Sequence, residues 1–191
     1  MTDSSARKNS LTFILLLVIV VMGFEIVYLV YQSRQLQAAL TEASSLQVLE
    51  QGQMVPSLTA AYLDGTPAQV LYGDNEPSTV LIWFSPSCHV CEDNAVFWNY
   101  LYDRYGGSER VRFLAMSDSD PAETGPYVTQ HALTFPVICV TDDRLIDAYN
   151  GRVMPQTALI SPQGAIGQVW PGALEQTRQD EITAALDLLT D

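Results

Sequence analysis

A continuous apolar run followed closely by a cysteine pair restricts the fold of this chain more than any other feature of the sequence. TVLIWF, residues 79–84, has the pattern of a central strand that is covered on both faces. Cys88 and Cys91 come directly after it. The residues that follow have helical spacing of apolar side chains, in Val96, Phe97, Tyr100 and Leu101. The sequence therefore predicts two sulfurs at the turn from a buried strand into a helix.

This position gives the cysteine pair a defined chemistry. Cys88 lies at or just before the helix N-terminus, where free N–H groups and the helix dipole favour a thiolate, the nucleophile of disulfide exchange. Cys91 lies one turn further on the same face, so it can attack a mixed disulfide and release the product. His89 either favours the thiolate when protonated or is a solvated residue of the helix start, and Glu92 opposes thiolate formation. We therefore expect thiol–disulfide exchange.

Three other uses of the pair remain open. A structural zinc site needs four ligands, and the remaining Cys139, His89 and His131 have no zinc-site spacing. Copper(I) could be held by the two cysteines together with Met154, because sulfur ligands suit this ion. A purely structural disulfide is the third use, although a loop this short gains little entropy from closure. Cys139 itself lies in FPVICV, which is expected to be a core strand, and is expected to be a buried, inert thiol.

The remaining segments alternate between strand and helix patterns. Two short strands flank the turn dipeptide Asp64-Gly65. Further strands are expected over 111–116, 135–140, 156–161 and 165–170, and helices over 121–131, 144–149 and 175–189, the first irregular because of Pro126. This order predicts an α/β fold whose central sheet is partly parallel and ends in an antiparallel hairpin.

The N-terminal part has a different composition. Residues 11–31 form an apolar run broken only by Glu25, long enough for a single transmembrane helix. We expect residues 1–10 to be a cytoplasmic tail, 32–51 a helical stalk and 52–191 the folded domain. Arg7 and Lys8 precede the run and Arg34 follows it, which favours a domain outside the membrane, in the periplasm of a bacterium. Glu25 either lies near the outer interface or contacts a partner helix.

The charge of the chain excludes one class of partner. Residues 35–191 contain 6 Arg and no Lys against 20 Asp and Glu, a formal charge of −14. Nucleic acid phosphates and anionic lipid surfaces both repel such a domain. We therefore expect no nucleic-acid binding.

From residue 52 onward the chain resembles the membrane-anchored thioredoxin-like redoxins of the TlpA/ResA type, which are related to the AhpC/TSA proteins. The resemblance rests on the leading hairpin and on TVLIWFSPSCHVC, FPVICVTDDRLIDAYN and GRVMPQTALISPQGAIGQVWPG. It implies a thioredoxin-like fold, a redox-active Cys88–Cys91 disulfide and no other cofactor. It also implies that Pro155 is cis and that Met154 offers backbone hydrogen bonds to an extended substrate.

The resemblance further implies that the chain reduces disulfides of protein substrates during cytochrome c or metalloenzyme assembly, at the bacterial inner membrane, and that a membrane protein is its electron donor. Three positions depart from the family pattern, with Ser87 where thioredoxins have Trp, Ile82 for a buried Asp and Asn94 for a Glu. Proton transfer to Cys91 would then use water, Glu92 or another carboxylate. The alternatives are an assembly factor like that of methylamine dehydrogenase maturation, a copper(I) chaperone, and an accessory subunit held through the stalk and Glu25.

Overall fold

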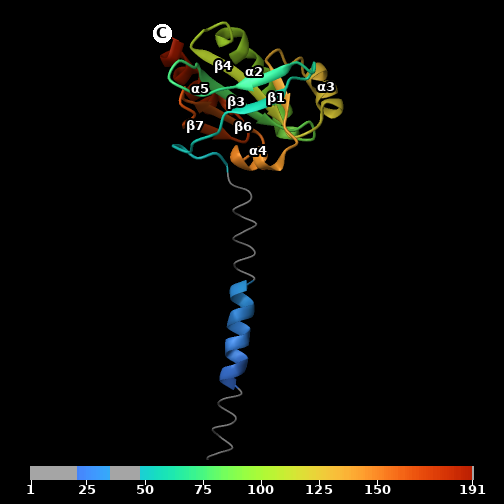
Figure 1. Ribbon diagram of the computed structural model, residues 1–191, viewed down its shortest axis with the longest axis vertical. Helices are drawn as coiled ribbons and strands as arrows, with labels where there is room; N and C mark the ends of the chain where they lie inside the picture. Colours follow the sequence, from blue (N-terminus) through green and yellow to red (C-terminus); the bar gives the residue numbers. More distant parts are fainter. Residues whose placement is uncertain (1–20, 35–47, 191) are drawn as a thin grey trace, which may run out of the picture. The chain divides into compact units, whose positions relative to one another are not determined.

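A strand of seven consecutive buried residues, β3 (Ser78–Phe84), lies at the centre of the fold. Figure 1 shows the computed structural model, which describes residues 21–34 and 48–190. The five-stranded sheet has the order β5-β4-β3-β6-β7. β4 (Val111–Ser117) and β5 (Val137–Cys139) run parallel to β3, whereas β6 (Gln156–Ile160) and β7 (Ile166–Pro171) form the antiparallel part. The predicted mixed sheet is confirmed.

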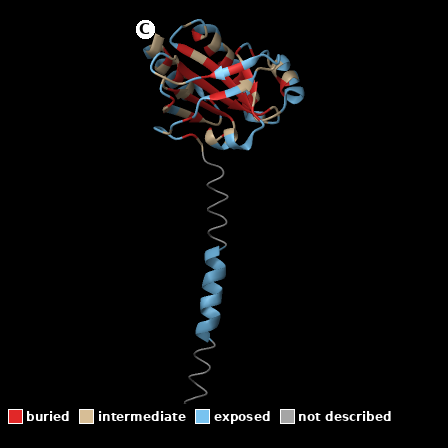
Figure 2. Cartoon of the chain, in the orientation of Figure 1, coloured by how far each residue is buried: buried red, intermediate tan, exposed pale blue. Residues whose placement is uncertain are grey.

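The two faces of β3 support two separate apolar cores, which Figure 2 shows as the buried centre of the domain. Val80, Ile82 and Phe84 contribute to one core, because alternate side chains of a strand point to opposite faces. That core is covered by α2 (His89–Tyr105), α3 (Pro121–Gln130) and α5 (Gln176–Thr190). Leu81 and Trp83 contribute to the second core, beneath α4 (Asp143–Ala148) and the N-terminal hairpin.

The N-terminal hairpin forms a sheet of its own. β1 (Leu58–Ala61) and β2 (Pro67–Val70) pair antiparallel around the predicted turn. Isolated bridges connect this region to both edges of the main sheet, from Tyr62 to Ile138 on β5 and from Met54 to Ala165 beside β7. The hairpin and the segment before it therefore contact both edges of the main sheet as well as one of its faces.

The folded unit begins earlier than its predicted start at residue 52. The chain divides into two units, residues 1–45 and 46–191. Leu49 has 2% of its surface exposed and packs in the second core, so residues 48–51 belong to the domain and are not helical. The apolar side chain draws this segment onto the sheet, which corrects the predicted end of the stalk.

In the first unit, residues 21–34 form a helix with exposed side chains. The predicted tail over 1–10, the first half of the predicted transmembrane segment over 11–31, and stalk residues 35–47 lie outside the described residues. Among the helices within 21–34 and 48–190, none is both long and apolar enough to cross a bilayer.

Two details of the second unit differ from the sequence-based expectation. α3 continues through Pro126, which lacks an N–H donor, so the helix forms with one hydrogen bond fewer. The strand expected over 135–140 is shorter and lies at the sheet edge. Cys139 ends this strand and is only partly buried, so the expectation of a fully buried thiol was wrong.

Candidate redox site

The structure places the two cysteines of the motif in a disulfide at the start of α2. Cys88 is the N-cap of this helix and is joined to Cys91, with their Cα atoms 5.3 Å apart. Cys88 is partly exposed, whereas Cys91 has 0% of its surface exposed. One sulfur can therefore meet an incoming protein, and the other can react only with the first.

Backbone hydrogen bonds fix the loop that carries the pair. The Cys88 N–H donates to the Ser85 carbonyl oxygen (3.1 Å), and the Cys91 N–H donates to the Cys88 carbonyl oxygen (3.1 Å). The side chain of the N-cap residue, Cys88, makes no capping hydrogen bond with the described part of the helix. The first turn therefore keeps N–H groups free to stabilise a Cys88 thiolate after reduction.

The two predicted modulators pair with each other. His89 Nδ1 lies 3.3 Å from Glu92 Oε2, and the His89 side chain is 95% exposed. His89 is therefore a solvated residue of the helix start, which was one of the two expectations. Glu92 places a carboxylate in the same turn as the disulfide.

The Met154–Pro155 peptide bond is cis, as the resemblance implied. Pro155 is buried and Met154 is partly exposed, and both Met154 and Cys88 pack against the first core. The Pro155 carbonyl oxygen accepts a hydrogen bond from the Gly172 N–H (2.8 Å). The proline loop is thereby held against the end of β7.

Two buried polar residues directly after Pro155 stabilise this arrangement, and the sequence analysis assigned them no role. Gln156 Nε2 donates to the carbonyl oxygens of Asn150 (2.7 Å) and Val153 (2.6 Å), which closes the loop before the proline. Thr157 Oγ1 accepts from Trp98 Nε1 (3.0 Å), which connects β6 to α2. Polar residues in an otherwise apolar strand were the sequence signal for these roles.

Asn94 occupies the position where the resemblance led us to look for a Glu. It is 2% exposed, and both ends of its amide are bonded. Its Nδ2 donates to the Gly172 carbonyl oxygen (3.0 Å), and its Oδ1 accepts from the Leu174 N–H (2.9 Å). Asn94 is therefore a structural connection between α2 and the β7–α5 loop, and Ile82, buried in the core, offers no ionisable group either.

A buried phenol lies beneath the motif. The Tyr127 ring stacks on Phe84, with centroids 5.3 Å apart, and contacts the tilted ring of His131, with centroids 4.3 Å apart. Its hydroxyl has no hydrogen-bond partner among the described residues. Burial raises the pKa of Tyr127 to about 12, and the negative charge of Glu92 acts in the same direction. The phenol stays protonated at neutral pH, and sequence reasoning gave no signal for it.

Cys139, a further predicted ligand, lies apart from the pair. Cys139 ends β5 at the same end of the sheet where β3 leads into the cysteine pair. However, β4 lies between β5 and β3. Burial raises the pKa of the Cys139 thiol, while a hydrogen bond with Thr124 opposes the shift. Within residues 21–34 and 48–190, no three His, Cys, Asp or Glu side chains are grouped closely enough to hold a metal ion.

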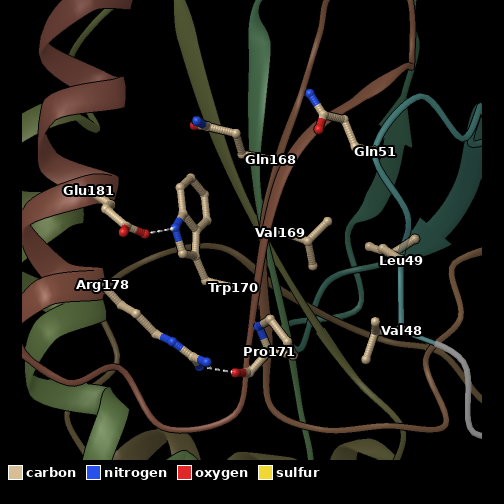
Figure 3. A pocket seen from close by; sticks show the side chains of 9 residues that line it. All are labelled: Val48, Leu49, Gln51, Gln168, Val169, Trp170, Pro171, Arg178 and Glu181. Atoms are coloured by element: carbon tan, nitrogen blue, oxygen red, sulfur yellow. Dashed lines mark hydrogen bonds between the residues drawn. The ribbon is translucent and has the colours of Figure 1, made fainter.

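A separate cavity of about 530 Å³ lies beside β7 and α5, shown in Figure 3. Two of its side chains already have partners, because Trp170 Nε1 donates to Glu181 Oε2 (3.0 Å) and Arg178 donates to the Pro171 carbonyl oxygen. Its lining contains no cysteine. This cavity belongs to the packing of α5 on the sheet edge and not to the redox site.

The sheet order, the CxxC pair at a helix N-terminus and the opposing cis-proline together define a thioredoxin-like domain. The family model described as "AhpC/TSA family" matches residues 51–169, and the chain belongs to this family. The thioredoxin domain of a thiol-disulfide oxidoreductase from Bacteroides vulgatus has the same fold, with a TM-score of 0.61 and 13% identity over 72% of this chain and 99% of that one.

Two relatives named thiol-disulfide oxidoreductase ResA are similar in sequence. The protein of Geobacillus kaustophilus is 30% identical over 94 residues, which are 49% of this chain and 52% of the relative. The chain thus spans about half the length of this relative. The protein of Geobacillus thermodenitrificans is 25% identical over 170 residues, which are 88% of each chain.

Proposed function

We propose that this chain is a membrane-tethered, periplasmic thiol–disulfide oxidoreductase that reduces disulfides of protein substrates. The main support is the unequal exposure of a bonded cysteine pair, with an accessible Cys88 at a helix N-terminus and Cys91 behind it. The names of the ResA relatives support the same activity. Assembly of cytochrome c or of a metalloenzyme is the process we propose for its substrates.

The reaction balances as a transfer of two electrons. The Cys88 thiolate attacks one sulfur of a substrate disulfide, forms a mixed disulfide and releases the other substrate sulfur as a thiolate. The Cys91 thiolate then attacks the Cys88 sulfur, which closes the Cys88–Cys91 bond and releases the second substrate thiolate. Water, Glu92 or another carboxylate takes the Cys91 proton. A dithiol of a membrane protein returns the pair to its reduced form.

The cis-proline gives the substrate its orientation in this proposal. The free backbone groups of Met154 would hydrogen-bond an extended substrate segment beside Cys88, as a short added strand. Pro155 cannot donate a hydrogen bond itself, and its carbonyl is occupied by Gly172. Met154 is therefore the position that meets the substrate backbone.

Single cysteine variants of the full chain test the activity. We expect Cys88→Ser to abolish exchange with a protein disulfide, and Cys91→Ser to accumulate a mixed disulfide through Cys88, both read by mass spectrometry. Cys139→Ser is the matched control and should exchange like the native chain. Full exchange by Cys88→Ser would refute the proposal.

The direction of electron flow has its own measurement. Equilibration of the pair against glutathione should give a potential well below about −200 mV for a reductant, whereas a value near −120 mV indicates an oxidant. For the location, we expect the chain to remain with membranes after alkaline extraction and its domain to be digested by protease added to spheroplasts. Protection of the domain would contradict the periplasmic orientation.

A further inference from the structure

A groove between α2 and α5 lies on the helix that begins at the reactive pair. Its volume is about 490 Å³. α2 contributes Asp93, Val96, Phe97 and Tyr100, and α5 contributes Gln179 and Asp180 among others. The groove thus starts within two turns of Cys88 and continues along the helix away from it.

The α2 wall of the groove carries large apolar side chains that are exposed to solvent. Val96 is 79% exposed, and Tyr100, one helical turn further, is 46% exposed. The Tyr100 ring stacks on Phe97, with centroids 6.0 Å apart, so the tyrosine is held at the groove wall. These side chains would lose solvent-exposed apolar area if a partner covered them.

The charged side chains around the groove indicate which kind of partner segment could bind there. Asp93 and Asp180 are exposed on the two facing helices. Among the described residues that line the groove, none is Lys or Arg. The Arg104 guanidinium, which donates to the Tyr100 hydroxyl (3.0 Å), is itself paired with Asp187 (2.9 Å). An anionic membrane surface would be repelled, whereas a segment with cationic side chains beside an apolar one would fit.

The two walls of the groove are both connected to the proposed substrate site, since α2 begins at Cys88 and α5 follows the loop that contacts the cis-proline. The Gly172 N–H donates to the Pro155 carbonyl, the Gly172 carbonyl accepts from Asn94, and the Leu174 N–H donates to Asn94. The β7–α5 loop therefore leads from the cis-proline to the start of α5. Eight residues of helix separate Cys88 from Val96, about 12 Å, the length of about four extended residues.

We propose that this groove binds the substrate protein next to its reacting cysteine. A large apolar side chain about four residues from that cysteine contacts Val96 and Tyr100, and neighbouring Lys or Arg side chains lie beside Asp93 and Asp180. This inference rests on the proposed exchange function and names the sequence class of its substrates.

Three peptides test it with the reduced full-length chain. Each carries one cysteine as a mixed disulfide with thionitrobenzoate, whose release is coloured, and the fourth residue from the cysteine is Leu flanked by Lys, Leu flanked by Glu, or Ser flanked by Lys. We expect the Leu–Lys peptide to react about tenfold faster than either of the others at low salt. Its advantage over the Leu–Glu peptide should shrink as salt increases.

Variants of groove residues test whether these peptide preferences arise at the groove. Val96→Ser should remove most of the preference for Leu over Ser, and Asp180→Asn should lower the preference for Lys over Glu about two- to fivefold. Leu188→Ser, an 82% exposed position on α5, and Asp103→Asn, an exposed carboxylate near the other end of α2, are the matched controls and should keep both preferences.

The possible results distinguish a failure of the groove proposal from a failure of the proposed exchange function. Equal rates for all three peptides, or equal losses in variants and controls, would overturn the groove while leaving exchange intact. A chain that reacts with none of the peptides would overturn the proposed function as well.

Discussion

The Asn94 side chain donates a 3.0 Å hydrogen bond to the carbonyl oxygen of Gly172, and this contact holds the helix of Cys91 to the end of β7. The Gly172 N–H in turn donates to Pro155. The cysteine pair and the cis-proline are therefore fixed relative to each other through the buried side-chain amide of Asn94 and the backbone of Gly172. Asn94, at the position where the resemblance predicts a Glu, therefore has a structural role.

Asn94→Ala should destabilise the domain by about 1–3 kcal/mol, because the buried Leu174 N–H and the partly buried Gly172 carbonyl each lose their partner. Urea unfolding followed by circular dichroism measures the loss. Asn99→Ala is the control, since Asn99 also bonds both backbone donors and acceptors but near the surface, where water replaces it. A larger effect at Asn99 than at Asn94 would contradict this role.

Two glycine substitutions should have opposite effects on stability. A Cβ atom at Gly151 would collide with the Trp83 indole ring, inside the second core, so Gly151→Ala should cost about 3 kcal/mol or more. A Cβ at Gly125, in α3, meets nothing within 4 Å, so Gly125→Ala should stabilise by up to about 1 kcal/mol. Thermal unfolding of the two variants distinguishes them, and a shift of the same sign in both would refute the packing argument.

Acid should weaken the contact between α2 and α5. The Tyr105 hydroxyl donates to Asp187 Oδ1 (2.6 Å), and this bond, more than the Arg104 charge, lowers the pKa of Asp187 below its ordinary 3.8. A lowered carboxyl pKa contributes stability above that ordinary value, and the contribution is lost as pH falls through the folded-state pKa. Asp187→Asn should therefore show less loss of urea resistance between pH 4 and pH 2 than the native chain does. An unchanged slope would contradict the assignment.

Alkaline pH tests the same Tyr105–Asp187 hydrogen bond through the titration of the tyrosine. Burial, followed by the Asp187 contact, raises the pKa of Tyr105 above its ordinary 10.0. A raised phenol pKa contributes stability fully below pH 10, and this is lost as pH rises through the folded-state value. Tyr105→Phe should be less sensitive to pH in this range, as measured by unfolding in urea. Equal sensitivity in the two chains would sink this prediction.

The third thiol should react slowly. Burial raises the pKa of Cys139 above its ordinary 9.0, so little thiolate is present at neutral pH. In the reduced chain, iodoacetamide should modify Cys88 well before Cys139 at pH 7, and the Cys139 rate should still increase above pH 9. Peptide mass mapping gives both rates, with Cys139→Ser as the control for peptide assignment. Equal labelling at pH 7 would contradict a shielded thiol.

The sheet and the reactive pair were predictable from local signals. The run of apolar residues in β3, the spacing of Cys88 and Cys91 and the turn at Asp64-Gly65 each specify one local structure. The cis bond before Pro155 was not a local signal, because the dipeptide alone favours trans, and it came only from the resemblance.

The contacts between distant segments were not predictable. Asn94 with Gly172, Gln156 with Leu49 and Gly151 with Trp83 join positions far apart in the chain, and each depends on how the layers meet. The start of the domain was misplaced for the same reason, since Leu49 is buried only once β6 and α4 provide the surface that covers it.

The hydrogen bond from the Leu49 N–H to Gln156 Oε1 has a mechanical consequence. Gln156 is the residue directly after Pro155, and Asn150, just before that loop, donates to the Val48 carbonyl. A pulling force on the chain ahead of Val48 would thus load these bonds before it reached the sheet. The first residues of the domain and its proline loop would therefore bear the same load, so tension on one would be transmitted to the other.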